Sequence, residues 1–316
     1  METAQRDSLR RHYGRIGLAL FLYFALTLLL QTAFHLVINY AASALTEKSW
    51  YALALSFVPM YAVGFPVFCA LLPRAPAREL LPEKGKLPLS FFVLLLMCFG
   101  CLYPGNLIGQ GADALVSRLL RAPSMGNPVE ALADRSGLTA YFLFAVLLAP
   151  VLEELTFRKL LLDRLRLIDK PSALIFSSLA FALFHGNLVQ VFYAFGAGLV
   201  LGAVYLRCGK VRVTMLLHIL INLLGGFVTV VLLRFVDVND LMATPLPTLL
   251  LSVYGLAMVA AAVAGVVFLI RERGLFRVGD AGDRLGPGDR FCLPFLRPGF
   301  ILYFFAALAV MFLAYY

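Results

Sequence analysis

The sequence predicts an all-α protein, a polytopic transmembrane bundle of eight to nine helices. Of its 316 residues, 61% are hydrophobic and only 14% are charged, which is too little polar surface for a soluble domain. Apolar runs of about 18 or more residues recur along the chain, and each is long enough to cross a membrane as a helix. No alternating pattern predicts a transmembrane barrel, so helices must satisfy the backbone hydrogen bonds.

The apolar runs define the expected order of the membrane segments. These are 16–42, 51–72, 88–108, 139–160, 172–187, 189–206, 213–233, 247–270 and 298–316. Between them, residues 112–136 are expected to form a short amphipathic interfacial piece, and 271–297 a solvated connection. We treat 1–316 as one membrane domain, divided into an N-terminal part (1–138), a core (139–225) and a C-terminal part (226–316).

The net charge of +9 is explained by membrane topology. Most of the 27 Lys and Arg residues fall in alternate connections, which indicates a cytoplasmic N-terminus under the positive-inside rule. No basic stripe with interleaved aromatics is present, so nucleic acid is not an expected partner. The first apolar segment is too long for a cleaved signal and is expected to be retained. The chain is therefore predicted to be a multi-pass integral membrane protein. Plasma membrane and endoplasmic reticulum both remain open, and a bacterial plasma membrane is favoured.

Two carboxylates occupy an unusual position. All but two of the 18 Asp and Glu residues lie in loops or at segment ends, whereas Glu153 and Glu154 follow the apolar run 141–152. Carboxylates at membrane depth are costly and usually face a functional cavity. Arg158 lies one helical turn after Glu154 and is expected to pair with it, which leaves Glu153 free as a general base. The alternative is an ordinary charged helix end beside a cytoplasmic loop.

Two of the four histidines belong to helical patterns. Phe181 and His185 form FxxxH on one face of the fifth segment, and His218 and Asn222 form HxxxN on one face of the seventh. Each histidine alone would more often serve packing or helix–helix hydrogen bonding. Four polar groups in an apolar bundle favour a shared site.

Counting along the chain places these groups at one depth. Glu153 lies 16 residues before Asp169, and His185 lies 16 residues after it. In an antiparallel helical hairpin, equal counts bring two residues to the same level. His218 enters the seventh segment from the same side, so we expect a single cavity.

Prolines and small residues predict where the helices bend or pack closely. Pro150 is expected to kink the fourth segment next to the glutamates. Gly186 and Asn187 would break the chain between the fifth and sixth segments, which are then re-entrant or strongly tilted. Gly198 and Gly202 form a GxxxG that predicts close helix packing, with dimerisation as the weaker interpretation.

Three motifs occur in order over about 70 residues: EExxxR, FxxxH and HxxxN. Together they resemble the family of CAAX prenyl endopeptidases and bacteriocin-processing (CPBP, Abi) membrane proteases, an intramembrane glutamic protease family. The resemblance covers roughly residues 140–225, the family's core domain. Its residues here are Glu153, Glu154, Arg158, Phe181, His185, His218 and Asn222.

The resemblance implies an endopeptidase that uses water without covalent catalysis. Glu153 and His185 would activate the water for attack on the scissile carbonyl. His218 and Asn222 would form an oxyanion hole. Glu154 and Arg158 would support the site.

The resemblance also implies the partners. No cofactor is required, and the substrate would be a peptide or lipidated protein at the membrane. A prenylated CAAX tail, a bacteriocin leader and another membrane-anchored peptide all fit, in contact with membrane lipids. The oligomeric state is left open.

Other classes of protein remain as alternatives. A zinc peptidase would use two histidines and a glutamate, but the sequence lacks HExxH, and asparagine is a poor zinc ligand. In a transporter or scaffold the buried polar groups would form a proton relay, although no repeated half is visible. A third alternative is an inactive, immunity-type relative. Cys98 and Cys101 are spaced as CxxC inside an apolar helix and are interpreted as packing residues.

Overall fold

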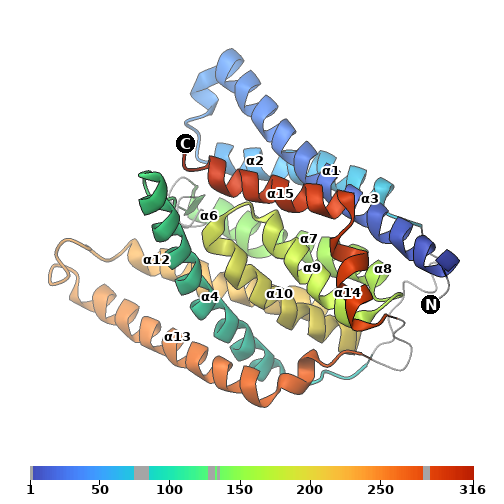
Figure 1. Ribbon diagram of the computed structural model, residues 1–316. Helices are drawn as coiled ribbons and strands as arrows, with labels where there is room; N and C mark the ends of the chain where they lie inside the picture. The colour runs from blue at the N-terminus through green and yellow to red at the C-terminus, as the bar shows by residue number, and fades with distance from the viewer. Residues whose placement is uncertain (1–2, 75–84, 127–131, 134–135, 280–284) are drawn as a thin grey trace.

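The computed structural model describes residues 3–74, 85–126, 132–133, 136–279 and 285–316. In these ranges the regular secondary structure is helical and no strand occurs. Figure 1 shows the helices running side by side through one bundle, with α1 and α15 adjacent along its upper edge. The predicted all-α fold is therefore confirmed.

The helices fall into three groups along the chain. The first contains α1 (Thr3–Ala42), η1 (Ser43–Leu45), α2 (Tyr51–Phe57), the π-helical η2 (Val58–Gly64), α3 (Phe65–Leu71) and α4 (Phe91–Leu120). The second contains α6 (Leu138–Tyr141), η3 (Phe142–Leu148), α7 (Ala149–Glu154), η4 (Leu155–Leu162), α8 (Asp163–Leu165), α9 (Lys170–Phe184), α10 (Leu188–Cys208) and α11 (Val211–Asn222). The third contains η5 (Leu223–Phe227), α12 (Val228–Leu233), α13 (Pro245–Arg271), η6 (Arg273–Phe276), α14 (Pro287–Phe295) and α15 (Pro298–Leu313).

Seven helical segments among the described residues are long and apolar enough to cross a membrane. A further pair of helices, Gly288–Phe295 and Pro298–Leu313, is bent by 71° and forms either a broken eighth crossing or a re-entrant loop. The apolar run expected at 172–187 instead forms the 15-residue helix α9. A helix of that length extends about 22 Å, which is shorter than a hydrocarbon core of about 30 Å. The described residues therefore contain seven or eight candidate crossings, at or just below the lower end of the predicted eight to nine.

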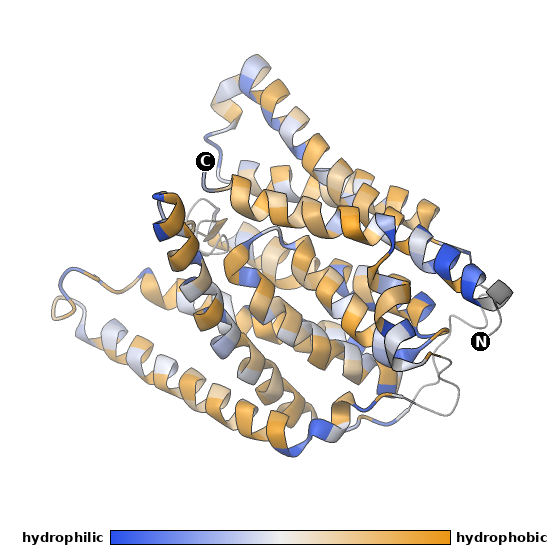
Figure 2. Ribbon diagram, viewed as in Figure 1, coloured by the Kyte–Doolittle hydropathy of each residue, from blue (hydrophilic) through white to orange (hydrophobic). Residues whose placement is uncertain are grey.

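Two large buried cores, with a smaller third one around Tyr141 and Val146, hold the described part of the bundle together. In the first, α1 packs along α15, and Tyr23 of α1 stacks on Phe68 of α3 with ring centroids 5.1 Å apart. In the second, α4 packs between α10 and α13 around Met97 and Leu201. Because α10 also packs on α9, it joins the two cores. Figure 2 shows hydrophobic residues along most of α13, and several of them, such as Leu249, Leu256 and Val263, are exposed, as expected for a helix that faces lipid.

The GxxxG of α10 produces the predicted close packing. A Cβ on Gly198 would lie 3.1 Å from the Cα of Ser178, and one on Gly202 would lie 2.7 Å from Leu174 Cδ1. Both neighbours belong to α9. The small residues therefore allow the short helix α9 to lie directly against α10.

The chain breaks between α9 and α10 as predicted. His185 caps the end of α9, Gly186 adopts a positive φ of 58°, and the side chain of Asn187 accepts a hydrogen bond from Gln190 N at 3.0 Å. Gly186 permits the left-handed conformation, and Asn187 caps the first turn of α10. Because α9 is short, this break leaves His185 inside the bundle.

Two expectations about connections are wrong. The segment 112–120 continues α4 without interruption instead of starting a separate interfacial piece, and residues 127–131, 134 and 135 lie outside the described residues. The connection 271–297 contains η6 and the nine-residue helix α14, so it is not simply solvated, although 280–284 lie outside the described residues. In both places, polar residues in the sequence concealed helices that tertiary contacts stabilise.

Candidate functional site

The two glutamates lie on α7, inside the membrane-crossing segment Leu138–Leu165. This segment is irregular, because π-helical turns precede and follow α7. The expected kink at Pro150 therefore takes the form of wider helical turns. The N–H of Ala149 donates to Phe144 O, one residue farther back than in an α-helix. In this register the carbonyl of Ala145 lies opposite Pro150, which has no N–H to donate.

Asn222 satisfies this carbonyl. Its Nδ2 donates to Ala145 O at 3.0 Å, across 77 residues of sequence. The contact ties the end of α11 to η3, just before the glutamates. An asparagine amide carries two N–H donors, so one remains after this bond.

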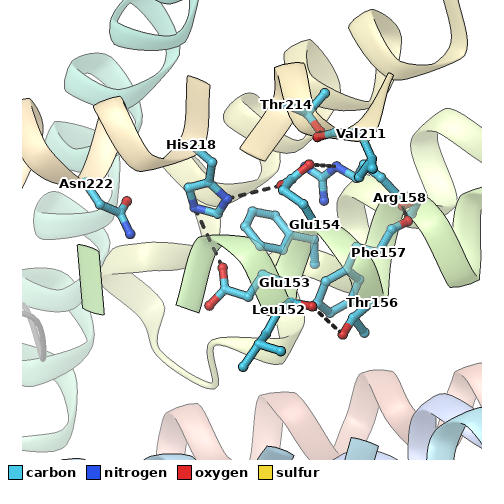
Figure 3. Close-up of polar contacts among 12 residues, drawn as sticks. Leu152, Glu153, Glu154, Thr156, Phe157, Arg158, Val211, Thr214, His218 and Asn222 are labelled. Atoms are coloured by element: carbon cyan, nitrogen blue, oxygen red, sulfur yellow. Dashed lines mark hydrogen bonds and ion pairs between the residues drawn. The ribbon is translucent and has the colours of Figure 1, made fainter. Parts of the chain in front are cut away.

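Glu154 lies at the centre of the site, with its side chain fully buried. One carboxylate oxygen, Oε2, lies 3.2 Å from Arg158 Nε, which confirms the predicted pair. The other, Oε1, lies 3.1 Å from His218 Nδ1 (Figure 3). Glu154 is therefore held between a guanidinium on its own helical segment and an imidazole on α11.

Arg158 is also fully buried. Its guanidinium carbon lies 4.7 Å from the centroid of the Phe181 ring, in a cation–π contact. Within the described part of the chain, none of its three guanidinium nitrogens has a well-aligned hydrogen bond. The ion pair with Glu154 is thus the main interaction that offsets the desolvation of the Arg158 charge. Without that partner, the buried cation would destabilise the fold.

His218 connects the two glutamates. Because Nδ1 contacts Glu154, Nε2 points toward Glu153, and it lies 3.7 Å from Oε2 of that carboxylate. This separation is too long for a direct hydrogen bond. A bridging water is the ordinary way to join polar groups at such a distance.

Glu153 differs from its neighbour in exposure. Its side chain is 21% exposed, whereas that of Glu154 is 0% exposed. Figure 3 shows the Glu153 carboxylate on the side of the His218 ring away from Glu154 and Arg158. The expected division between a paired and an accessible carboxylate is therefore present.

His185 lies nearby but makes no direct polar contact with Glu153 or His218 in the described structure. Its Nδ1 donates to Phe181 O at 2.9 Å, which leaves the lone pair on Nε2 available. The Phe181 ring lies edge-on to both imidazoles, at 4.9 Å from His185 and 5.8 Å from His218. Phe181 thus packs against both histidines.

The expected equal depth on the two arms of the hairpin is supported by a ring contact. Phe157 and Phe181 each lie 12 residues from Asp169, and their ring centroids are 5.2 Å apart. Glu153 lies one turn farther along one arm, and His185 one turn farther along the other. The turn at Asp169 therefore sets the register on which the site depends.

Two features of the site are not predicted by the sequence. Phe181 was noted only as part of a motif, yet its ring contacts both imidazoles and Arg158. No sequence pattern marks the Ala145 carbonyl as part of the site. The only indication is Pro150, five residues later, which has no N–H to donate to that carbonyl. Among the described residues, no group of three or more His, Cys, Asp and Glu side chains is arranged to hold a metal ion.

The fold and this cluster define a multi-pass helical membrane protein with carboxylate and imidazole groups inside the bundle. Residues 135–224 match the protein family described as "Type II CAAX prenyl endopeptidase Rce1-like". The matched stretch includes all the motif residues and confirms the resemblance inferred from them. No curated protein and no solved structure matches the chain.

Proposed function

We propose that the protein is an intramembrane glutamic endopeptidase in which Glu153 activates a water molecule. One observation supports this most directly: Glu153 is partly exposed and 3.7 Å from His218 Nε2, beside a fully buried Glu154 that is paired with Arg158. A paired carboxylate is a poor base, whereas an accessible one beside an imidazole is suited to taking a proton from water. The family match to residues 135–224 supports the same class of reaction.

In the proposed reaction, the water lies between Glu153 and the scissile carbonyl of a peptide. Glu153 takes one proton as the water oxygen bonds to the carbonyl carbon, which produces a tetrahedral oxyanion. The carbon–nitrogen bond then breaks, and Glu153 returns the proton to the leaving amine. His185 would help to orient the water through its Nε2 lone pair.

The oxyanion would receive hydrogen bonds from His218 and Asn222. Asn222 has a second amide N–H beyond the one bonded to Ala145 O. His218 donates through Nε2 when its ring carries both protons, and the carboxylates of Glu153 and Glu154 flank that ring. Each such donor, preorganised away from water, contributes about 3 kcal/mol to transition-state stabilisation.

The substrate in this proposal is a peptide held at the membrane. A prenylated CAAX tail and a leader-bearing peptide both present a flexible segment next to a lipid anchor or an apolar helix. Because the site lies within a membrane-crossing segment, a substrate anchored in the bilayer would reach it more readily than a free peptide would.

The decisive experiment uses the purified full chain in detergent with a panel of quenched fluorescent peptides, prenylated and not. Glu153→Gln should lower kcat/KM by at least about 10³-fold with an unchanged thermal unfolding midpoint. Glu47→Gln, at an exposed position far from the site, is the matched control and should cleave like wild type. Cleavage by Glu153→Gln at the wild-type rate would refute the proposal. Loss of wild-type cleavage after chelation, with recovery on adding zinc, would favour the zinc peptidase instead.

A further inference from the structure

We propose that a pocket between α1 and α3, outside the candidate active site, binds the phosphate headgroup of an anionic membrane lipid. The pocket has a volume of about 680 Å³ and lies at the N-terminal end of α1. Arg11 and Arg15 of α1 line it, and Arg74 lines it just after α3. No acidic residue belongs to its described lining.

The three arginines are free to bind an anion. None of them forms a hydrogen bond or ion pair with another described side chain. Neighbouring arginines of the same helix are paired: Arg6 with Asp289 at 2.6 Å and Arg10 with Asp7 at 3.0 Å. The unpaired cations therefore gather in the pocket, where the guanidinium forks suit phosphate oxygens.

The wall of the pocket indicates an amphiphile rather than a soluble anion. Leu18 and Leu22 continue the face of α1 that carries the two arginines, at the spacing of one helical stripe. They are 45% and 36% exposed, and Leu71 of α3 opposite them is 41% exposed. Both helices belong to membrane-crossing segments, so these leucines face hydrocarbon. A cationic end above an apolar groove matches a lipid phosphate with its acyl chains.

An aromatic layer separates this pocket from the glutamates. Tyr23 follows Leu22 on α1, stacks on Phe68 of α3, and its ring centroid is 4.7 Å from that of Phe184. Phe184 precedes His185. A lipid in the pocket would bridge α1 and α3 without reaching Glu153, so its binding is measurable independently of proteolysis.

The test uses the full chain reconstituted in vesicles of equal phosphatidylglycerol and phosphatidylcholine, then native mass spectrometry of the released protein. Wild type should retain phosphatidylglycerol in preference to phosphatidylcholine. The triple variant Arg11→Gln/Arg15→Gln/Arg74→Gln should bind phosphatidylglycerol at least about tenfold more weakly, which corresponds to about 1.4 kcal/mol. The matched control is Arg212→Gln/Arg271→Gln/Arg273→Gln, which removes the same charge from exposed positions outside the pocket and should bind like wild type.

Three results would overturn the proposal. These are equal retention of the two lipids by wild type, equal loss in both triple variants, and saturation of the site by inorganic phosphate at concentrations that displace phosphatidylglycerol. The last would identify a site for a soluble phosphate. If the triple variant does not fold, Arg15→Gln and Leu22→Trp test the charge and the groove separately, and each should weaken phosphatidylglycerol binding.

Discussion

The side chains of Glu154 on α7 and His218 on α11 meet inside the bundle, with Oε1 of the carboxylate 3.1 Å from Nδ1 of the imidazole. This contact fixes the orientation of the ring and turns its other nitrogen toward Glu153. Glu154 thereby has two neighbours, because its second oxygen lies beside Arg158. A buried carboxylate that holds both a cation and an imidazole is a positioning residue as well as a structural one.

Removing the charge of Glu154 should destabilise the fold. Glu154→Gln leaves the Arg158 guanidinium buried without a counter-ion, and we expect a loss of about 3–5 kcal/mol in unfolding free energy. Reversible denaturation in detergent measures this loss. The double variant Glu154→Gln/Arg158→Met should recover most of it, because no uncompensated ion remains. A double variant as unstable as the single one would show that the ion pair is not the cause.

Asn222 should affect both chemistry and stability. In Asn222→Ala we expect kcat to fall about 10²-fold or more, because the proposed oxyanion donor is lost, with little change in KM. The same change leaves Ala145 O without its donor and should cost about 1 kcal/mol of stability. Separate determination of kcat, KM and the unfolding midpoint distinguishes the two effects. A lower midpoint with full kcat would give Asn222 a structural role only.

The contact between α4 and α13 should depend on Gly265, which faces Gly100 of α4. A Cβ on Gly265 would lie 1.9 Å from Leu96 O, so Gly265→Ala must push the two helices apart. We expect a loss of about 1–3 kcal/mol, measured by thermal unfolding. Gly255→Ala, on the same helix with no atom within 4 Å of its Cβ position, is the control and should be neutral or slightly stabilising. An equal loss at both positions would contradict close packing at Gly265 as its cause.

The C-terminus should be held by Asp113, which is 2% exposed on α4. Its carboxylate accepts hydrogen bonds from the Tyr315 hydroxyl, the Ser124 hydroxyl and the N–H of Met125. Tyr315→Phe removes a hydrogen bond to a charged group, so we expect a loss of about 1.5–3 kcal/mol.

Tyr316→Phe is the matched control for this prediction, because Tyr316 is 89% exposed. Its stability should equal that of wild type. Hydrogen exchange of the last turn of α15 provides a second measurement and should accelerate in Tyr315→Phe alone. Unchanged exchange there would mean that this bond does not anchor the C-terminus.

Local features of the site were predictable from sequence. The Glu154–Arg158 pair follows from a spacing of four residues, which any helix brings to one face. The register of the hairpin followed from counting on each side of Asp169, because helical rise is constant. The break before α10 followed from Gly186 and Asn187, which favour a turn and a helix cap.

Contacts between distant helices were not predictable in the same way. The sequence did not indicate that Asn222 bonds to Ala145 O, because that contact depends on a π-helical turn. A π turn inserts one residue and rotates everything after it by about 100°. Asp113 was assigned to a connection, since nothing local shows that Tyr315, about 200 residues later, supplies a hydrogen bond there.

By itself, the sequence determined the membrane class, the helical fold and the set of polar groups in the core, because burial energies and helical periodicity are local properties of residue type and spacing. Only the tertiary structure decided which imidazole orients toward which carboxylate and which arginines remain unpaired. Those relationships depend on the rotation and separation of whole helices, and packing across the bundle sets both.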